Sequence, residues 1–323
     1  MSAVLVIGSQ GALGSTVVRA FDVAGWDVHR AARRPGTSFR LVDLDTPDTL
    51  RRAFEGIDVV VNTVPHPGLA AETAVLTHGG LLLNISALSV SAATALPAAG
   101  SGTVVMNAGL APGVVNLVAA DLVARHPDAD GIELALTLSA SGTSGPAGGE
   151  FVHRHLTSRR RHATATIPFP PPIGERRCVE IAEREHGWLG AAAGARSVRT
   201  YLCISEPLLH RSVLAANRTG VLSLLPRAAF VGGRKGPPGD ASTEAFSEWV
   251  AVLRGGQRLA ARTVEGEGDY RSTAAATVVL AEALLRRGDL PAGRFDPEDL
   301  LSLGDVSGPL EAAGIRVVDR SRA

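Results

Sequence analysis

The chain has very little cysteine and lysine, and both scarcities narrow its chemistry. Only two residues are cysteine, Cys178 and Cys203, and they lie too far apart in the sequence to form a CxxC redox or zinc motif. Lys235 is the only lysine, so Schiff-base catalysis would depend on it alone, and it lies in the Gly/Pro-rich loop sequence GGRKGPPGD. We therefore discount Schiff-base chemistry and expect no metal site.

Long apolar runs and an excess of one charge are also missing. Thirty-two basic residues balance 32 acidic ones, which argues against a nucleic-acid-binding surface. There is no 18-residue apolar span and no secretory signal segment, because the N-terminus enters a core-like strand at once. We expect a cytoplasmic protein whose partner is a small molecule, not a nucleic acid or a membrane.

The most informative stretch is VLVIGSQGALG at residues 4–14, an apolar run followed by three glycines at three-residue spacing. Gly8 suits a tight turn, Gly11 a close backbone approach to a pyrophosphate, and Gly14 close packing of a helix on a strand. The helix after the turn would offer unpaired N–H groups to phosphates. The alternative is that the glycines serve packing alone. The expected contacts with the dinucleotide come from Gly8, Ser9, Gln10, Gly11, Ala12, Leu13 and Gly14.

Strands and helices alternate up to about residue 125, which predicts an α/β fold with a doubly wound parallel sheet. Further strands are expected at 27–31, 39–43, 58–64, 81–85 and 103–106, and helices at 47–54, 69–78 and 113–125. From about residue 131, β-forming runs cluster without helices between all of them, which indicates a second α+β domain with a mostly antiparallel sheet. We expect a Rossmann domain over 1–125 completed by 270–323, including a long helix at 273–286, and a substrate or dimerisation domain over 126–269.

The end of the second strand bears on cofactor preference. An NAD-preferring site places an acidic residue there, whereas this chain has Ala32 followed by Arg33 and Arg34. A guanidinium suits the 2′-phosphate of NADP, so we expect NADP with Arg33 as the main contact. The alternative is that both arginines are merely solvated.

Other cofactor contacts are expected where parallel strands end, because ligands bind outside the carboxyl ends of such strands. Asp43 would lie near the adenine, or would only cap the next helix. Thr63, Val64 and Pro65 would lie near the nicotinamide ribose. Ser86 follows the fifth strand and is equally explained as a helix cap.

Three segments resemble the saccharopine dehydrogenase-like reductases: NTVPHPGL after the fourth strand, LLLNISAL at the fifth, and above all MNAGLAPGVVNLVAADLV at 106–123. The late segments GDYRSTAAATVVLAEALL and AGRFDPEDL resemble the closing helix and turn of the same family. The resemblance is specific at Gly109, Pro112, Gly113 and Asn116 and vague from about 145 to 265. It implies a Rossmann domain, a second domain over the nicotinamide, often a homodimer, and formation or reduction of a C–N bond between amino-acid-like partners.

Two of the matching positions, Gly109 and Pro112, are taken as further cofactor contacts through this resemblance. One departure matters: several members carry Asp directly before the Pro-Gly of this turn, where this chain has Ala111. An acidic role at that position does not transfer, and saccharopine itself becomes doubtful as a substrate.

The sequence indicates catalytic groups only weakly. The short-chain reductase mechanism needs Lys four residues after Tyr, but Tyr201 is followed at that offset by Ser205 and Tyr270 by Ala274. Hydride transfer to an imine needs little more than a positioned cofactor and one proton donor. His66, directly after the fourth strand, is the first candidate; the alternative is that it only bonds the backbone of its Pro-bracketed turn.

A second candidate is His153, in the expected helix FVHRHLTSRR that follows the loop SGTSGPAGGE at 141–150. The loop either closes over substrate or is simply flexible. His153 and His155 lie two residues apart and so do not share a helix face, and zinc binding is not expected. Arg159 to Arg161 are taken as a solvated face, and the two cysteines as buried packing.

These observations favour an NADPH-dependent oxidoreductase that acts on a small imine, carbonyl or amino-acid-derived substrate. Two alternatives stay open. The first is a non-catalytic NADP-binding redox sensor, since no acid/base pair is recognisable in the sequence. The second is a reductase of an activated C=C bond, which the same cofactor site would serve.

Overall fold

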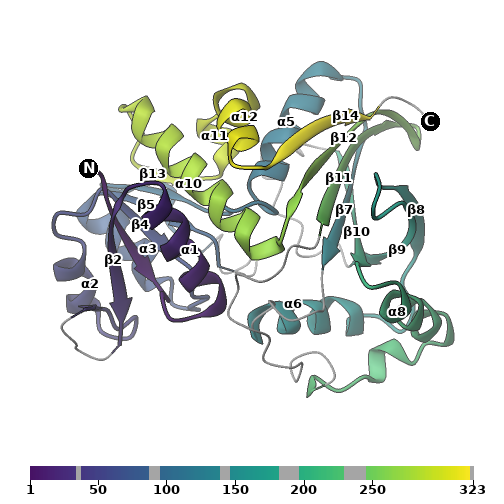
Figure 1. Cartoon of the computed structure of the whole chain (residues 1–323), viewed down its shortest axis with the longest axis horizontal. Coiled ribbons are helices and arrows are strands. Elements are labelled where there is room, and N and C mark those ends of the chain that lie inside the picture. Colours follow the sequence, from purple (N-terminus) through teal and green to yellow (C-terminus); the bar gives the residue numbers. More distant parts are fainter. Residues whose placement is uncertain (34–37, 87–94, 139–145, 182–195, 229–244, 321–323) are drawn as a thin grey trace. The chain divides into compact units, whose positions relative to one another are not determined.

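The computed structural model describes residues 1–33, 38–86, 95–138, 146–181, 196–228 and 245–320. The chain forms two compact units, each of which collects two separate segments (Figure 1). The first unit comprises Met1–Val114 and Thr273–Leu310, and the second comprises Val115–Ser272 and Glu311–Ala323. The sequence placed the whole C-terminal tail with the first domain, whereas β14 (Arg316–Arg320) pairs with a strand of the second unit.

The first unit is built on a parallel sheet, as the alternating strand and helix pattern predicts. Its described part contains seven strands in the order β13-β6-β5-β4-β1-β2-β3, and every pair is parallel. This is the doubly wound order 3-2-1-4-5-6 with one strand added beside β6. The strands are β1 (Ala3–Ile7), β2 (Asp27–Ala32), β3 (Arg40–Leu41), β4 (Val59–Asn62), β5 (Leu81–Asn84), β6 (Thr103–Val105) and β13 (Gly293–Phe295).

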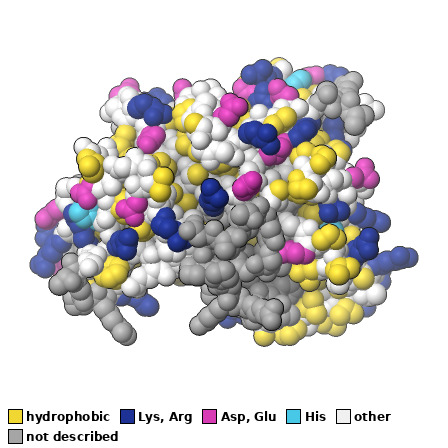
Figure 2. Space-filling view, in the orientation of Figure 1, with side chains coloured by type: hydrophobic (Ala, Val, Ile, Leu, Met, Phe, Trp, Pro, Cys, Tyr) yellow, Lys and Arg dark blue, Asp and Glu magenta, His cyan; other side chains and the backbone are white. Residues whose placement is uncertain are grey.

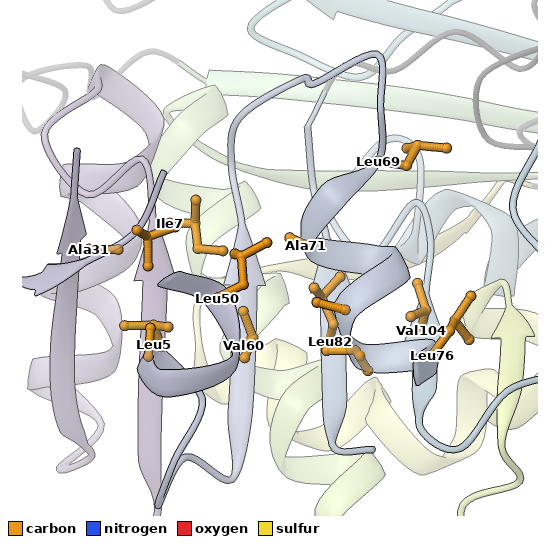
Figure 3. Packing of buried hydrophobic residues seen from close by; sticks show 14 of the residues in the cluster. Leu5, Ile7, Ala31, Leu50, Val60, Leu69, Ala71, Leu76, Leu82 and Val104 are labelled. Atoms are coloured by element: carbon orange, nitrogen blue, oxygen red, sulfur yellow. The ribbon is translucent and has the colours of Figure 1, made fainter. Parts of the chain in front are cut away.

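Helices cover both faces of this sheet. On one face, α2 (Pro47–Ala53) and α3 (Ala70–His78) pack Leu50 and Leu76 against strand residues such as Leu82 (Figure 3). On the other face lie α1 (Ala12–Val23) and the later part of α10 (Asp269–Arg287). Burial on both faces explains the continuous apolar strand sequences AVLVI, VVVN and LLLN. Two short helices complete the unit, α11 (Pro297–Leu300) and α12 (Leu303–Ala312).

The second unit is built on a mixed sheet, in agreement with the predicted mostly antiparallel domain. In its described residues the strand order is β14-β12-β11-β7-β10-β9-β8, in which β7 and β10 are parallel and the other pairs are antiparallel. The sequence analysis did not predict β12, the longest of the described strands. The strands are β7 (Gly131–Leu138), β8 (Thr164–Pro168), β9 (Glu175–Ile181), β10 (Ser197–Ile204), β11 (Ala245–Arg254) and β12 (Gln257–Glu267).

Helical segments flank the second sheet: α5 (Val114–Arg125), α6 (Pro146–Thr157), α8 (Pro207–Thr219) and the short η3 (Leu222–Leu224). None of the helices that the structure describes has the length and apolar character needed to span a bilayer. On the visible face of the first unit, acidic and basic side chains are interspersed (Figure 2). This distribution agrees with the formal net charge of zero.

Candidate functional site

The glycine turn between β1 and α1 is closed so tightly that two of its glycines cannot carry a side chain. Gly8 has φ +83°, and a Cβ added there would lie 2.4 Å from the Thr63 hydroxyl oxygen. A Cβ on Gly14 would lie 2.0 Å from the carbonyl oxygen of Gly8, which places α1 directly against the end of β1. The turn therefore brings α1 against the strand in the way that a dinucleotide-binding turn requires.

The beginning of α1 is open to an anion. Gly11 precedes the helix in extended conformation, no side-chain hydrogen bond caps the helix start, and its first turn carries no acidic residue. Gln10 and Gly11 are exposed, and Ala12 and Leu13 are partly exposed as the helix begins. Unpaired N–H groups and the positive end of the helix dipole attract phosphate at such a position.

The end of β2 is joined to this turn. The Ser9 hydroxyl is buried and donates a hydrogen bond of 2.9 Å to the carbonyl oxygen of Ala31. Arg33 follows two residues later and is exposed, and Ala32 between them offers no carboxylate. Arg34 lies outside the described residues. The position beside the glycine turn thus holds an exposed cation and no acid.

Asp43 acts within its own loop. Its Oδ1 accepts a hydrogen bond from the Asp45 backbone N–H at 3.1 Å, and its Oδ2 accepts one from the Thr46 hydroxyl at 3.3 Å. These contacts hold the loop before α2, but Asp43 does not cap the helix, because the N-cap residue is Thr46 and no side-chain hydrogen bond caps the helix start. The carboxylate is half-buried, so an adenine contact at this strand end stays a prediction.

A buried acid fixes the ends of β4 and β5. Asn62 and Asn84 are register partners at these strand ends, and both amide nitrogens donate to Glu72 Oε1, at 2.7 Å and 2.5 Å. Only 1% of each of the three residues is exposed. The two amide oxygens in turn accept hydrogen bonds from the Val64 N–H and from the Ser86 N–H and hydroxyl. The Glu72 carboxylate therefore positions, through the two asparagines, the first residues of the loops after β4 and β5.

The loop after β4 leaves its residues partly open to solvent. The Thr63 hydroxyl donates to the carbonyl oxygen of Ile7 at 2.8 Å, so its oxygen faces β1 beside the glycine turn. Val64 is partly exposed and Pro65 is exposed. Ser86, whose hydroxyl donates to Asn84, is partly exposed, and residues 87–94 that follow it lie outside the description.

His66 is turned toward the loop after β3. Its Nε2 lies 3.2 Å from Asp45 Oδ1, and its ring packs beside Gly68, where an added Cβ would lie 3.1 Å from Cε1. Its backbone carbonyl accepts a hydrogen bond from the Leu69 N–H. In a doubly wound sheet the half built from β1 to β3 binds the adenosine side of a dinucleotide. The orientation of His66 toward that half weakens the case for it as a proton donor.

The turn NAGLAPG, part of the segment that resembles the saccharopine dehydrogenase-like reductases, follows β6 and is tightly folded. Gly109 is buried, its N–H donates to the Pro112 carbonyl oxygen at 3.2 Å, and a Cβ on it would lie 3.3 Å from both that oxygen and Thr273. Pro112 is partly exposed. Asn107 has φ +56°, a left-handed conformation that few residues other than glycine adopt, and its amide donates to Asp296 Oδ1 at 2.8 Å.

The histidine candidates of the second unit lie on α6, which begins earlier than the sequence predicts. His153 is partly exposed, and His155 is buried with its Nδ1 2.8 Å from the Phe151 carbonyl oxygen. Residues 139–145, including the first five residues of the SGTSGPAGGE segment, lie outside the described part of the chain, and the other five belong to α6. Arg159 to Arg161 are exposed, as expected for a solvated face. No cluster of three or more potential metal ligands occurs among the described residues.

The two cysteines, distant in the sequence, meet on neighbouring strands. The pairing of Leu202 with Val179 brings Cys203 opposite Cys178, and both side chains are buried. The hydrogen bond between the two thiols and their burial raise the pKa of Cys178. These thiols belong to the apolar core of the second sheet.

The sequence interpretation missed Glu72, Asn62, Asn84 and Asp296. One signal was available: asparagine ends two consecutive apolar strand sequences, VVVN and LLLN, and a buried amide there needs a partner. Nothing in the sequence indicated that a glutamate on α3 supplies it.

The comparisons with known proteins agree with this fold. The model of the NAD dependent epimerase/dehydratase family matches residues 4–104, the part that carries the glycine turn. No curated protein sequence matches the chain. Among solved structures, the saccharopine dehydrogenase (L-Glu forming) of Saccharomyces cerevisiae is similar over 100% of both chains, with a TM-score of 0.61 and 13% identity. The amine dehydrogenase of Mycobacterium smegmatis is similar over 94% of this chain and 96% of its own, with a TM-score of 0.49 and 14% identity.

The strand order, the glycine turn and the family match support an NAD(P)-binding Rossmann domain in the first unit. The yeast structure shows that the same fold extends over the whole chain. The residues of the glycine turn in this chain fit a dinucleotide. Gly8 and Gly14 leave no room for side chains where the turn closes on α1, and the uncapped start of α1 offers N–H groups to a pyrophosphate.

Proposed function

We propose that this protein is an NADPH-dependent oxidoreductase that transfers a hydride to or from a small imine, carbonyl or amino-acid-derived substrate. The observation that carries the proposal is the glycine turn. It leads into an uncapped helix start, and the Ser9 to Ala31 hydrogen bond joins it to the end of β2, two residues before the exposed Arg33. The family match and the two-domain fold support the enzyme class.

In this proposal each part of the first unit has a distinct role in holding NADPH. The N–H groups at the start of α1 bind the pyrophosphate. Arg33 binds the 2′-phosphate through its planar guanidinium, and the Ser9 to Ala31 hydrogen bond keeps the end of β2 beside the turn. When bound, the nicotinamide supplies or accepts the hydride.

Three further predicted cofactor contacts lie in the loops after β4 and β5, the two strands whose ends are hydrogen-bonded to Glu72. Val64, Pro65 and Ser86 lie in the loops whose course is set by Asn62 and Asn84, so we assign them to the nicotinamide ribose. Gly109 and Pro112 are assigned to the cofactor through the family resemblance, and the burial of Gly109 leaves the partly exposed Pro112 as the better contact. The substrate class also rests on that resemblance.

A substrate panel tests the proposed activity. NADPH oxidation is followed at 340 nm with oxo acids combined with amines, with simple carbonyl compounds and with activated alkenes. We expect turnover with at least one imine-forming pair or carbonyl compound, and a KM for NADPH raised about tenfold or more in a Gly14→Ala variant that retains its fold. Tight NADPH binding without turnover on any member of the panel would contradict an enzyme and favour a redox sensor. Turnover with alkenes alone would replace the proposed substrate class.

A further inference from the structure

An acid and an amide meet where the edge strand β13 and its neighbour β6 end in the first sheet. Asn107 follows β6, Asp296 follows β13, and these strands are parallel neighbours with Val105 opposite Phe295. The Asn107 amide nitrogen donates to Asp296 Oδ1 at 2.8 Å. Because parallel strands bind ligands outside their carboxyl ends, this pair lies at the edge of the sheet where the cofactor binds.

The backbone around the pair is held in place. Asn107 keeps its left-handed φ of +56° within a turn so tight that a Cβ added to Gly113 would lie 2.0 Å from the Gly109 carbonyl oxygen and 2.7 Å from that of Asn107. The Met106 N–H donates to the Phe295 carbonyl oxygen at 2.8 Å. This turn and this bond fix the Asn107 backbone beside the end of β13.

We propose that Asp296 is the general acid and base of the reaction, oriented by Asn107. This inference rests on the proposed function. In the reducing direction, the bound dinucleotide would supply a hydride to the carbon of a C=N or C=O bond, and the π electron pair would move to the nitrogen or oxygen. That atom takes the proton of the Asp296 carboxyl, and solvent then reprotonates the carboxylate. Oxidation reverses these steps.

The surroundings of Asp296 suit both protonation states near neutral pH. Burial raises the pKa of its carboxyl to about 6, and the nearby Asp299 carboxylate adds to the rise, while the Asn107 hydrogen bond and the Arg294 guanidinium oppose it. The side chain is only partly buried, so a proton has a path to solvent. A carboxyl that titrates close to the working pH is suited to proton transfer.

The competing explanation is that Asp296 only caps a helix. It forms a capping box with Asp299 at the start of α11, and the Asp299 carboxylate accepts the Asp296 N–H at 2.8 Å. This role needs no proximity to the nicotinamide, whereas the catalytic role does. The two explanations therefore differ in how Asp296 responds to the charge on the cofactor.

The dissociation constants of NADP⁺ and NADPH, measured between pH 5 and pH 8, test this difference without any substrate. The oxidised nicotinamide carries one more positive charge, so a nearby carboxylate favours NADP⁺. We expect the Kd of NADP⁺ relative to that of NADPH to fall about fivefold as the pH rises through 6, given the Coulomb energy of two charges several ångströms apart in partly solvated surroundings. The 2′-phosphate is common to both forms, and its titration cancels in the ratio.

Asp296→Asn is expected to abolish this pH dependence with little change in NADPH affinity. Asp299→Asn, the matched control, is expected to keep it with a midpoint at lower pH, because the Asp299 carboxylate raises the pKa of Asp296. On any substrate that is turned over, Asp296→Asn lowers kcat by about 100-fold or more at unchanged KM for NADPH. A ratio that does not change with pH in the wild type, or a pH dependence that survives in Asp296→Asn, overturns the assignment while the proposed function stands. Failure of both nucleotides to bind overturns both proposals.

Discussion

The Asn62 amide nitrogen lies 2.7 Å from Glu72 Oε1, and this buried hydrogen bond ties the end of β4 to α3. Asn84 donates to the same oxygen from β5, so a single carboxylate satisfies two strand ends. Both asparagine oxygens then hold the loops assigned to the nicotinamide half of the cofactor. Loss of the carboxylate is expected to affect stability and cofactor binding together.

Glu72→Leu is the sharpest test of this network. It leaves two buried amide groups without their acceptor, each at a cost of about 1–3 kcal/mol, so we expect a loss of about 2–6 kcal/mol in the free energy of unfolding. Glu72→Gln keeps an acceptor oxygen and is expected to lose less. Urea unfolding followed by circular dichroism measures both variants. Equal stability of Glu72→Leu and the wild type would refute the assigned role.

Gly14→Ala tests the geometry of the turn. The added methyl group would lie 2.0 Å from the Gly8 carbonyl oxygen, so α1 and the turn must separate. We expect NADPH to bind about tenfold more weakly or worse, since overpacking costs about 1–3 kcal/mol. Gly308→Ala in α12 is the matched control, because a Cβ there meets no atom within 4 Å. It is expected to leave binding unchanged, and a similar loss in both variants would contradict the packing argument.

His210 makes the stability of the second unit depend on pH. Its Nδ1 accepts the Ile204 N–H at 3.3 Å and its Nε2 donates to the Arg177 carbonyl oxygen at 2.8 Å, an arrangement that needs the neutral ring. Burial lowers its pKa from the ordinary 6.5. The unfolded chain therefore takes up the proton first as the pH falls.

We accordingly expect stability to be lost below about pH 6.5, with a slope of at most about 1.4 kcal/mol per pH unit for this one proton. His210→Gln retains a donor for the Arg177 carbonyl and removes the titration. Unfolding free energies at pH 5 and pH 7.5 measure the difference. If the wild type and His210→Gln lose equal stability between these pH values, His210 is not the group responsible.

Much of the fold could be predicted because its signals are local. The apolar runs that became β1, β4 and β5 are buried on both faces, and glycine spacing marks the turn. The strand β12 was missed because only four consecutive residues of its eleven are buried. The pairing of β14 with β12 in the second sheet joins residues 51 to 59 positions apart, such as Ala261 and Arg320, and no local sequence pattern predicts such a contact.

The candidate site was predictable only in part. The glycine turn and Arg33 follow from short-range patterns, but the orientation of His66 depends on Asp45, 21 residues away in another loop. The contact between Asn107 and Asp296 spans 189 residues and exists only because β13 pairs with β6. Polar side chains that come together only because distant strands pair cannot be predicted from the local sequence around either residue.

The central claim is that the first unit binds NADPH through the glycine turn and Arg33. It is tested most directly by the dissociation constants of NADPH and NADH, measured by fluorescence titration for the wild type and for Arg33→Asp. We expect the wild type to prefer NADPH, and Arg33→Asp to weaken NADPH far more than NADH, because a carboxylate repels the 2′-phosphate. Equal effects of the substitution on both nucleotides, or a wild type that prefers NADH, would contradict the account.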